Sequence, residues 1–310
     1  MIEPEPLVCG IELGGSKCVG SVGTGPDDLR GRITIPTGRD AAATLQRIVA
    51  QMLDWQSVHG PIAALGIASF GPVDLSPPSR TYGHITTTPK PGWRFVDVVG
   101  TLTRALSVPT RFDTDVNGAA VGEGRWGAAR GLEDFAYVTV GTGIGVGLVV
   151  NGRPVHGFGH PELGHVRLAR DRTDAWPGSC ELHGDCVEGL ASATAIAARA
   201  GVAPDQVPAD SEIWHHVAHA LAQLLHTLVL ATAPRRIILG GGVLQSRPEL
   251  LVPVRAMLLE SLNGYLDLDA LVGPIDDYVV TPGLGPLAGP MGALALAVDA
   301  HRAHTPPATG

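Results

Sequence analysis

The chain has 310 residues, with 22 Lys and Arg against 30 Asp and Glu, and a formal net charge of −8. This acidic balance disfavours general binding to nucleic acids or anionic membranes, and no apolar run reaches the roughly 18 residues that predict a membrane span. A hydrophobic content of 45%, with 41 Gly and 25 Pro, is typical of a compact protein with many tight turns. At this length we expect two lobes with a cleft between them.

The first part of the chain alternates strand and helix signals. Apolar runs of strand length and residues at helical spacing distinguish the two kinds of element. They predict strands at 7–12 and 17–22, a helix at 41–55, a strand at 63–68, a helix at 97–106, a strand at 110–112 and a helix at 119–126.

The remaining elements include longer helices, rich in Ala and Leu. Pro234 is expected to end the longest of them, because proline cannot continue a helix. The pattern predicts strands at 135–140 and 146–150, helices at 192–200 and 211–233, a strand at 236–239, and helices at 248–263 and 286–303.

These elements predict an α/β protein with two sheets. We expect an N-terminal domain at 1–117, completed by the C-terminal helix near 288–303, and a C-terminal domain at 118–287. The small-residue tail 304–310 is expected to be disordered. The acidic, proline-bearing N-terminus lacks the basic and apolar parts of an export signal, which predicts a cytoplasmic protein with reduced cysteines.

Three glycine turns follow apolar strands, and each could bring backbone N–H groups close to a phosphate. For any single one of them, an ordinary hairpin or strand–helix turn is the favoured interpretation, but three together favour phosphate binding. None fits the dinucleotide or the Walker pattern. The turns are at Gly14-Gly15-Ser16, Gly141-Thr142-Gly143 with Gly145, and Gly240-Gly241-Gly242.

Four residues in one stretch have the chemistry of a closed tetrahedral zinc site, which takes thiolates and imidazoles. A disulfide between Cys180 and Cys186 is the alternative, whereas Cys9 and Cys18 are expected to be small buried side chains. The four candidate ligands are His165, Cys180, His183 and Cys186.

Asp115 lies in an acidic loop at a strand end, where a carboxylate could accept the proton of an attacking hydroxyl. Asn117, two residues on, could contact the same substrate. The alternative is that Asp115 caps the next helix.

Five ordered motifs resemble the ROK family of bacterial sugar kinases over residues 8 to about 300. They are Gly10-Ile-Glu-Leu-Gly-Gly-Ser-Lys17, Thr114-Asp-Val-Asn117, Gly141-Thr-Gly-Ile-Gly145, His160-Pro-Glu-Leu-Gly-His165 and Ile238-Leu-Gly-Gly-Gly242. Further motifs are similar to those of the zinc-containing fructokinases, namely Ser69-Phe-Gly-Pro72, Tyr82-Gly-His-Ile-Thr86, Pro89-Lys-Pro-Gly-Trp93 and Cys180-x-x-His-Gly-Asp-Cys186.

The resemblance implies an actin-like ATPase (ribonuclease H-like) fold, in which two related domains close over ATP and sugar. It implies Asp115 as the catalytic base, a structural Zn²⁺ held by the four ligands above, and Mg²⁺ near Glu12. The sugar-contacting residues implied are Asn117, Glu162, His165 and Glu188. The ATP-contacting residues implied are Gly14, Gly15, Ser16, Lys17, Gly141, Thr142, Gly143, Gly240, Gly241 and Gly242.

The function expected is MgATP-dependent phosphorylation of a hexose, with fructose as first choice and its 6-hydroxyl as acceptor, by a homodimer. A kinase for glucose, mannose or an N-acetylated amino sugar is the near alternative. A sugar-binding module without catalysis is the alternative from a different class. A ROK transcriptional regulator is disfavoured because only about seven residues precede the first strand, and a zinc hydrolase because four protein ligands leave no position for water.

Overall fold

The computed structural model describes residues 6–305, and these fall into two compact units. The first unit contains the described residues up to Arg130, the segment Val155–His160, and the described residues from Leu287 onward. The second unit contains Gly131–Pro154 and Pro161–Pro286. Residues 1–5, which bear on the expected absence of an export signal, and residues 306–310 of the expected disordered tail lie outside the described residues.

The first unit is built on a five-stranded sheet with the order β3-β2-β1-β4-β5. Strand β1 pairs antiparallel with β2 and parallel with β4, which in turn is parallel to β5. The three parallel strands therefore end at one edge, where Leu13, Ser69 and Thr114 are in register. The elements of this unit are β1 (Val8–Leu13), β2 (Lys17–Gly25), β3 (Asp28–Pro36), α1 (Ala41–His59), β4 (Ala64–Ser69), α2 (Val98–Leu106), β5 (Thr110–Thr114), α3 (Asp115–Trp126) and α11 (Ala288–His304).

The sheet of the second unit has the same topology, with the order β10-β9-β6-β7-β8. In both sheets a three-stranded antiparallel meander is extended by two strands parallel to the first strand of the meander. The elements are β6 (Phe135–Val140), β7 (Ile144–Val150), β8 (Arg153–Pro154), α4 (Val187–Ala191), α5 (Ala193–Ala200), α6 (Ile213–Thr232), β9 (Ile237–Gly240), α7 (Gly242–Ser246), α8 (Leu251–Leu262), α9 (Leu268–Val272), α10 (Ile275–Tyr278) and β10 (Val279–Val280).

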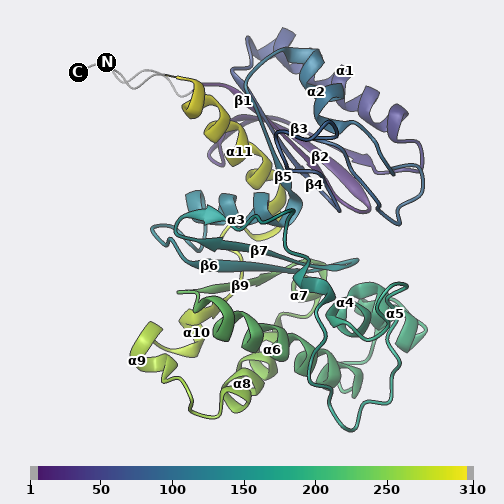
Figure 1. The fold of residues 1–310 in the computed structure, drawn as a ribbon, viewed down its shortest axis with the longest axis vertical. Helices are drawn as coiled ribbons and strands as arrows, with labels where there is room; N and C mark the ends of the chain where they lie inside the picture. The colour runs from purple at the N-terminus through teal and green to yellow at the C-terminus, as the bar shows by residue number, and fades with distance from the viewer. Residues whose placement is uncertain (1–5, 306–310) are drawn as a thin grey trace. The chain divides into compact units, whose positions relative to one another are not determined.

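Helix α11 packs closely on the first sheet and on α3 because glycines line the contact (Figure 1). A Cβ atom at Gly66 of β4 would come 2.0 Å from the carbonyl oxygen of Ala293, and one at Gly292 would come 2.2 Å from the backbone of Gly118. The side chains of Cys9, Ile11 and Leu13 instead join the large hydrophobic core that includes residues of α1 and α2. The sheet is thus covered on both faces.

The predicted helices and strands are all present, with ends shifted by a few residues. Helix α3 begins at Asp115 rather than at residue 119, so Asn117 lies in its first turn and the first unit continues past it to Arg130. His304 ends α11 rather than beginning a tail. Both Cys9 and Cys18 are buried, as expected. The elements that the sequence reading did not predict are β3, β8, β10, α4, α7, α9 and α10.

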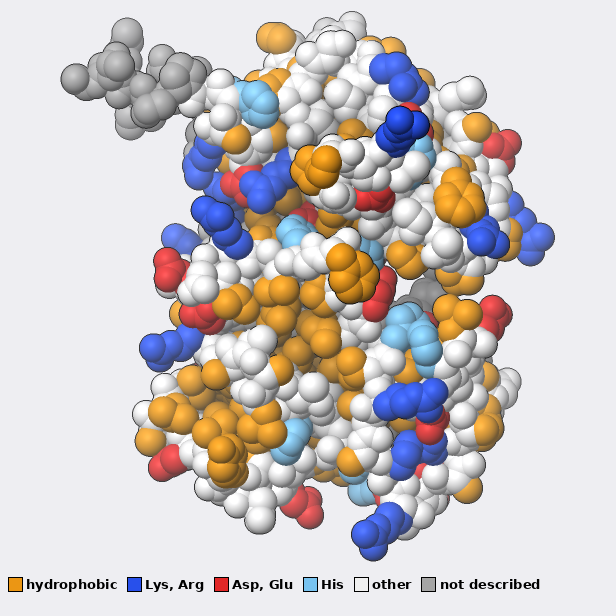
Figure 2. Space-filling view, in the orientation of Figure 1, with side chains coloured by type: hydrophobic (Ala, Val, Ile, Leu, Met, Phe, Trp, Pro, Cys, Tyr) orange, Lys and Arg blue, Asp and Glu red, His pale blue; other side chains and the backbone are white. Residues whose placement is uncertain are grey.

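Two surface properties concern what the protein could contact. Among the described residues, no helix is both long and apolar enough to cross a bilayer. Figure 2 shows hydrophobic side chains gathered over α8 and α9, where Leu259, Tyr265 and Leu271 are exposed. A pocket of about 450 Å³ is lined by Leu259 and neighbouring residues of this surface.

Candidate functional site

The first glycine turn joins β1 to β2 and presents its backbone to solvent. The N–H of Gly14 donates to the carbonyl oxygen of Lys17 at 3.0 Å, and a Cβ at Gly14 would come 2.8 Å from that oxygen, so only glycine fits. Thr37 holds the turn from behind, donating its hydroxyl to the carbonyl oxygen of Gly14 at 2.7 Å. Gly15, Ser16 and Lys17 are exposed, which leaves the tip of the turn accessible to a ligand.

Two carboxyl groups lie near this turn at the carboxyl edge of the first sheet. Glu12 is the penultimate residue of β1, next to the turn, and its carboxyl group faces Gly289 at the start of α11. The pKa of Glu12 is raised to about 7, chiefly by burial and also by the charge of Asp115, while the charge of Lys17 opposes the shift. Burial also raises the pKa of Asp115 to about 6, against hydrogen bonds from backbone N–H groups.

Asp115 is the first residue of α3 and does not cap it. The cap is Thr114, whose hydroxyl accepts a hydrogen bond from the N–H of Asn117 at 3.1 Å. The Asp115 carboxylate accepts from the N–H of Val116 at 2.9 Å and remains partly exposed. The alternative that Asp115 serves as the helix cap was therefore wrong, because the preceding threonine has that role.

Asn117 is buried in a polar group that the sequence reading did not predict. Its Nδ2 donates to Oδ1 of the buried Asp113 at 2.7 Å and lies 3.3 Å from Nε2 of His156. His156 in turn contacts the Asp113 carboxylate at 3.1 Å, and this hydrogen bond raises the pKa of the imidazole. His156 belongs to the segment Val155–His160, which is part of the first unit although the segments on either side of it belong to the second. No local sequence pattern predicts this.

The second glycine turn, between β6 and β7, is held by Glu188 of α4. Oε2 of Glu188 accepts from the N–H of Ile144 at 3.1 Å, and a Cβ at Gly143 would come 2.4 Å from the same oxygen. The carbonyl oxygens of Gly141 and Thr142 are bound by residues that begin α5. The turn predicted to contact phosphate and one residue predicted to contact sugar are therefore in direct contact.

The third glycine turn lies beside the second. Gly241 follows β9 with a φ of 95°, a conformation that favours glycine, and a Cβ there would come 2.4 Å from the carbonyl oxygen of Val140. Because β9 is parallel to β6, both turns leave the same edge of the second sheet. Gly242 then starts α7, with open space around its Cα.

The four predicted zinc ligands converge in the second unit. Nδ1 of His165 lies 3.7 Å from Sγ of Cys180 and 3.6 Å from Sγ of Cys186, and Nδ1 of His183 lies 3.8 Å from Sγ of Cys180. Zinc bonds of about 2.3 Å to sulfur and 2.0–2.1 Å to nitrogen place such atoms about 3.6 Å apart in a tetrahedron. The cluster therefore fits Zn²⁺ in both donor chemistry and spacing.

The surroundings of the cluster also favour a cation. Cys186 is fully buried, and burial raises the pKa of its thiol to about 11, so a thiolate there needs a bound positive charge. Tight backbone approaches at Gly164 and Gly189 shape the loops that carry the ligands. Glu162 is exposed immediately before the 3₁₀ turn Leu163–His165.

Comparisons with known proteins agree with these features. The model of the ROK family matches residues 8–300. The chain is 39% identical over 291 residues to a fructokinase of Pediococcus pentosaceus, covering 94% of this chain and 97% of that protein. It is 44% identical over 243 residues to a fructokinase of Zymomonas mobilis, covering 77% and 78%. The solved structure of a ROK hexokinase from Thermus thermophilus matches with a TM-score of 0.76 at 27% identity, covering 94% and 97%.

Two sheets of one topology, with glycine turns at the carboxyl ends of their strands, define an α/β protein of the sugar-kinase class with the actin-like ATPase fold. The chain belongs to the ROK family. The predictions of fold and family made from the sequence are confirmed.

Proposed function

We propose that this protein is a fructokinase that transfers the γ-phosphoryl group of ATP to the 6-hydroxyl of D-fructose. The observation that carries the choice of substrate is the identity of 39% and 44% to the two fructokinases, over most of the chain in each case. The resemblance to the family's sugar kinases implies ATP as the phosphoryl donor, and the exposed first glycine turn supplies backbone N–H groups suited to its phosphates.

Asp115 is proposed as the base. Its carboxylate takes the proton of the sugar hydroxyl as the hydroxyl oxygen bonds to the γ-phosphorus, and the bond from that phosphorus to the oxygen of ADP breaks. A pKa raised to about 6 leaves the carboxylate ionised at neutral pH but more basic than an ordinary aspartate. Phosphoryl transfer otherwise requires mainly positioning and charge neutralisation.

The proposed ATP contacts are the three glycine turns. The first turn contributes Gly14, Gly15, Ser16 and Lys17 to the phosphates, and the second contributes Gly141, Thr142 and Gly143. Gly240, Gly241 and Gly242 are proposed to contact the adenosine. Glu12 has the hard oxygen donors suited to Mg²⁺, which when bound through water would neutralise charge on the phosphates.

The proposed sugar contacts are Glu162, His165 and Glu188, together with Asn117. His165 turns Nδ1 toward both thiols, which leaves Nε2 on the opposite edge of the ring as a hydrogen-bond donor to a sugar hydroxyl. Zn²⁺ held by His165, Cys180, His183 and Cys186 would be structural, since four protein ligands complete its tetrahedron.

A hexose panel tests the choice of substrate. ADP release is measured with MgATP and D-fructose, D-mannose, D-glucose or N-acetylglucosamine, and we expect the highest kcat/KM with fructose. Preference for another hexose would correct the substrate within the same kinase class. Absence of ADP release with every sugar, in protein that binds fructose, would identify a binding module.

The variant Asp115→Asn tests the base. We expect kcat to fall by about 10² to 10⁴, the contribution usual for a general base, with little change in the Kd of a non-hydrolysable ATP analogue. The control is Asp54→Asn, at an exposed position on α1. Fast turnover in the Asp115 variant would remove this residue from the role.

We further propose a cytoplasmic homodimer. The four cysteines are free, in keeping with a reducing compartment. The exposed apolar surface over α8 and α9 supplies an area that association could cover (Figure 2). Light scattering of the purified protein gives the molar mass that tests the dimer.

A further inference from the structure

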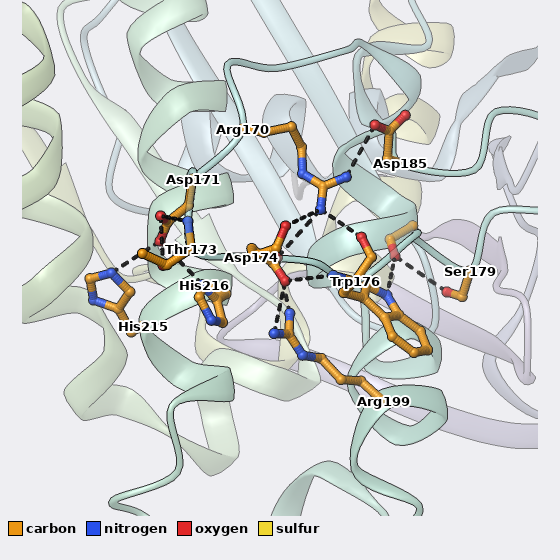
Figure 3. A network of polar contacts seen from close by, with 11 residues as sticks. Arg170, Asp171, Thr173, Asp174, Trp176, Ser179, Asp185, Arg199, His215 and His216 are labelled. Atoms are coloured by element: carbon orange, nitrogen blue, oxygen red, sulfur yellow. Dashed lines mark hydrogen bonds and ion pairs between the residues drawn. The ribbon is translucent and has the colours of Figure 1, made fainter.

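A second group of side chains of the types that can bind a metal lies in the second unit, apart from the thiol cluster of His165, Cys180, His183 and Cys186. Oδ2 of Asp171 is 3.2 Å from Nε2 of His215 and 3.2 Å from Nδ1 of His216. The two histidines are neighbours in the first turns of α6, and Figure 3 shows both rings turned toward the Asp171 carboxylate. All three donor atoms lie within 4.8 Å of one another.

We propose that Asp171, His215 and His216 form a second binding site for a divalent transition-metal cation such as Zn²⁺ or Co²⁺. Two imidazole nitrogens and one carboxylate oxygen are a common donor set for these ions. Bonds of about 2.0–2.1 Å in a tetrahedron place such donors about 3.3 Å apart, close to the two observed separations. Three protein ligands leave the fourth position open to water.

The carboxylate is oriented for this role by its other oxygen. Oδ1 of Asp171 accepts hydrogen bonds from the N–H of Thr173 at 2.9 Å and from its hydroxyl at 2.8 Å. These bonds leave Oδ2 directed at the imidazoles, as outer hydrogen bonds orient ligands in other metal sites. His216 is buried with 3% of its side chain exposed, whereas His215 is 55% exposed and gives a cation access.

A metal at this site would fasten the loop that carries the thiol cluster. Arg170, adjacent to Asp171, forms an ion pair at 3.1 Å with Asp185, which lies between the proposed zinc ligands His183 and Cys186. Asp174 in the same loop is paired with Arg199 of α5 at 2.9 Å (Figure 3). A bond from Asp171 to α6 through a metal would therefore restrain the loop at a third point.

The spectrum of bound Co²⁺ distinguishes the two sites. Thiolate ligands give Co²⁺ intense near-ultraviolet charge-transfer bands, whereas nitrogen and oxygen ligands do not. Metal-free protein is dialysed against Co²⁺, and bound metal is measured by mass spectrometry beside the spectrum. We expect two equivalents in the wild-type protein. His215→Ala should bind one equivalent with the thiolate bands unchanged, and the control His59→Ala, at the end of α1, should bind two.

A second variant guards against a folding defect in the first. Asp171→Asn keeps the size of the side chain but removes its charge, and we expect the Kd of the second equivalent to rise by at least about tenfold. One equivalent in the wild-type protein, or two in His215→Ala, would overturn the proposal. The three residues would then be a hydrogen-bonded anchor only.

Discussion

Asp115 illustrates how the surroundings of one carboxyl group set its chemistry. Thr114 supplies the cap of α3, so the Asp115 carboxylate is not needed there. Burial raises its pKa to about 6, and the backbone hydrogen bonds that it accepts limit the shift. The group is therefore a stronger base than an ordinary aspartate and is still ionised near neutrality.

The pH dependence of catalysis follows from this pKa. Only the carboxylate form can accept the proton, so kcat/KM for fructose should fall as the pH is lowered through about 6. Initial rates across a pH series at saturating Mg²⁺ measure this. A profile that stays flat well below pH 6 would contradict the assignment.

The raised pKa of Asp115 also makes the folding stability of the protein depend on pH. The pKa of Asp115 is higher in the folded than in the unfolded protein, so protonation of this group stabilises the folded state. That stabilisation is present at low pH and is lost as the pH rises through about 6. Asp115→Asn should therefore raise the melting temperature of the protein above that pH and have less effect in acid. Reduced stability at high pH would indicate that the carboxylate is held by stronger favourable contacts.

Local spacing explains which site residues could be predicted from the sequence. Cys180, His183 and Cys186 are close along the chain, so their pattern indicates a metal site before any folding is considered. His156 contacts Asp113 across 43 residues, and its loop carries no signal for that contact. The pairing of Glu188 with the turn at Ile144 was missed for the same reason.

At the scale of elements, α11 owes its position to residues without side chains. Gly10 and Gly66 let its backbone approach the sheet, and Gly292 lets it approach α3. Each added carbon would require the helix to move, because the nearest atoms belong to backbone rather than to flexible side chains.

We expect Gly292→Ala to lower the free energy of unfolding by about 1–3 kcal/mol, the usual cost of overpacking. The new Cβ would come 2.2 Å from the backbone of Gly118. Urea denaturation followed by tryptophan fluorescence measures the loss. The control Gly157→Ala, which has open space around it, should change stability little, and equal losses in both variants would remove close packing as the cause.

Of the elements that were not predicted from the sequence, β3 is a strand of ordinary length and the others are very short. Strand β3 has apolar residues at alternate positions, Leu29, Ile33 and Ile35 with Gly31 between them, so a period of two was available as a signal. Helices α4 and α7 have five residues each, too few for a helical period to be recognised. They form because neighbouring segments pack on them, which is a tertiary effect.

At the scale of the whole molecule, the proposed zinc couples separate segments of the second unit. Structural zinc contributes about 10–16 kcal/mol in small peptides, comparable with the stability of a whole domain. We expect a strong chelator to raise the Kd of fructose before that of an ATP analogue, because His165 is both a ligand and a proposed sugar contact. Glu188, two residues after Cys186, also connects the cluster to the second glycine turn, because its carboxylate accepts a hydrogen bond from the N–H of Ile144.

Calorimetric titration of chelated and zinc-restored protein with each ligand measures the two effects. Active protein containing less than about half an equivalent of zinc would contradict a structural role. Loss of ATP binding before loss of fructose binding would mean that the cluster supports the glycine turn more than the sugar loop.

The family and the α/β fold could be predicted from the sequence because the motifs stand in a fixed order along it. The equivalence of the two sheets could not, since β8 and β10 are only two residues long and β3 was overlooked. The return of Val155–His160 to the first unit is likewise a property of the folded chain and not of any local pattern.

The late position of α11 in the chain sets an order of events during synthesis. Ribosomes deliver a chain from its N-terminus at about 5–20 residues per second, and an N-terminal domain ordinarily folds first. Here strands β1 to β5 emerge early, yet the helix that covers β1 and β4 emerges after every segment of the second unit. Strands β6 to β9 of the second unit can therefore begin to fold while the part of the first sheet that α11 covers is still exposed, and this exposed part could bind a chaperone.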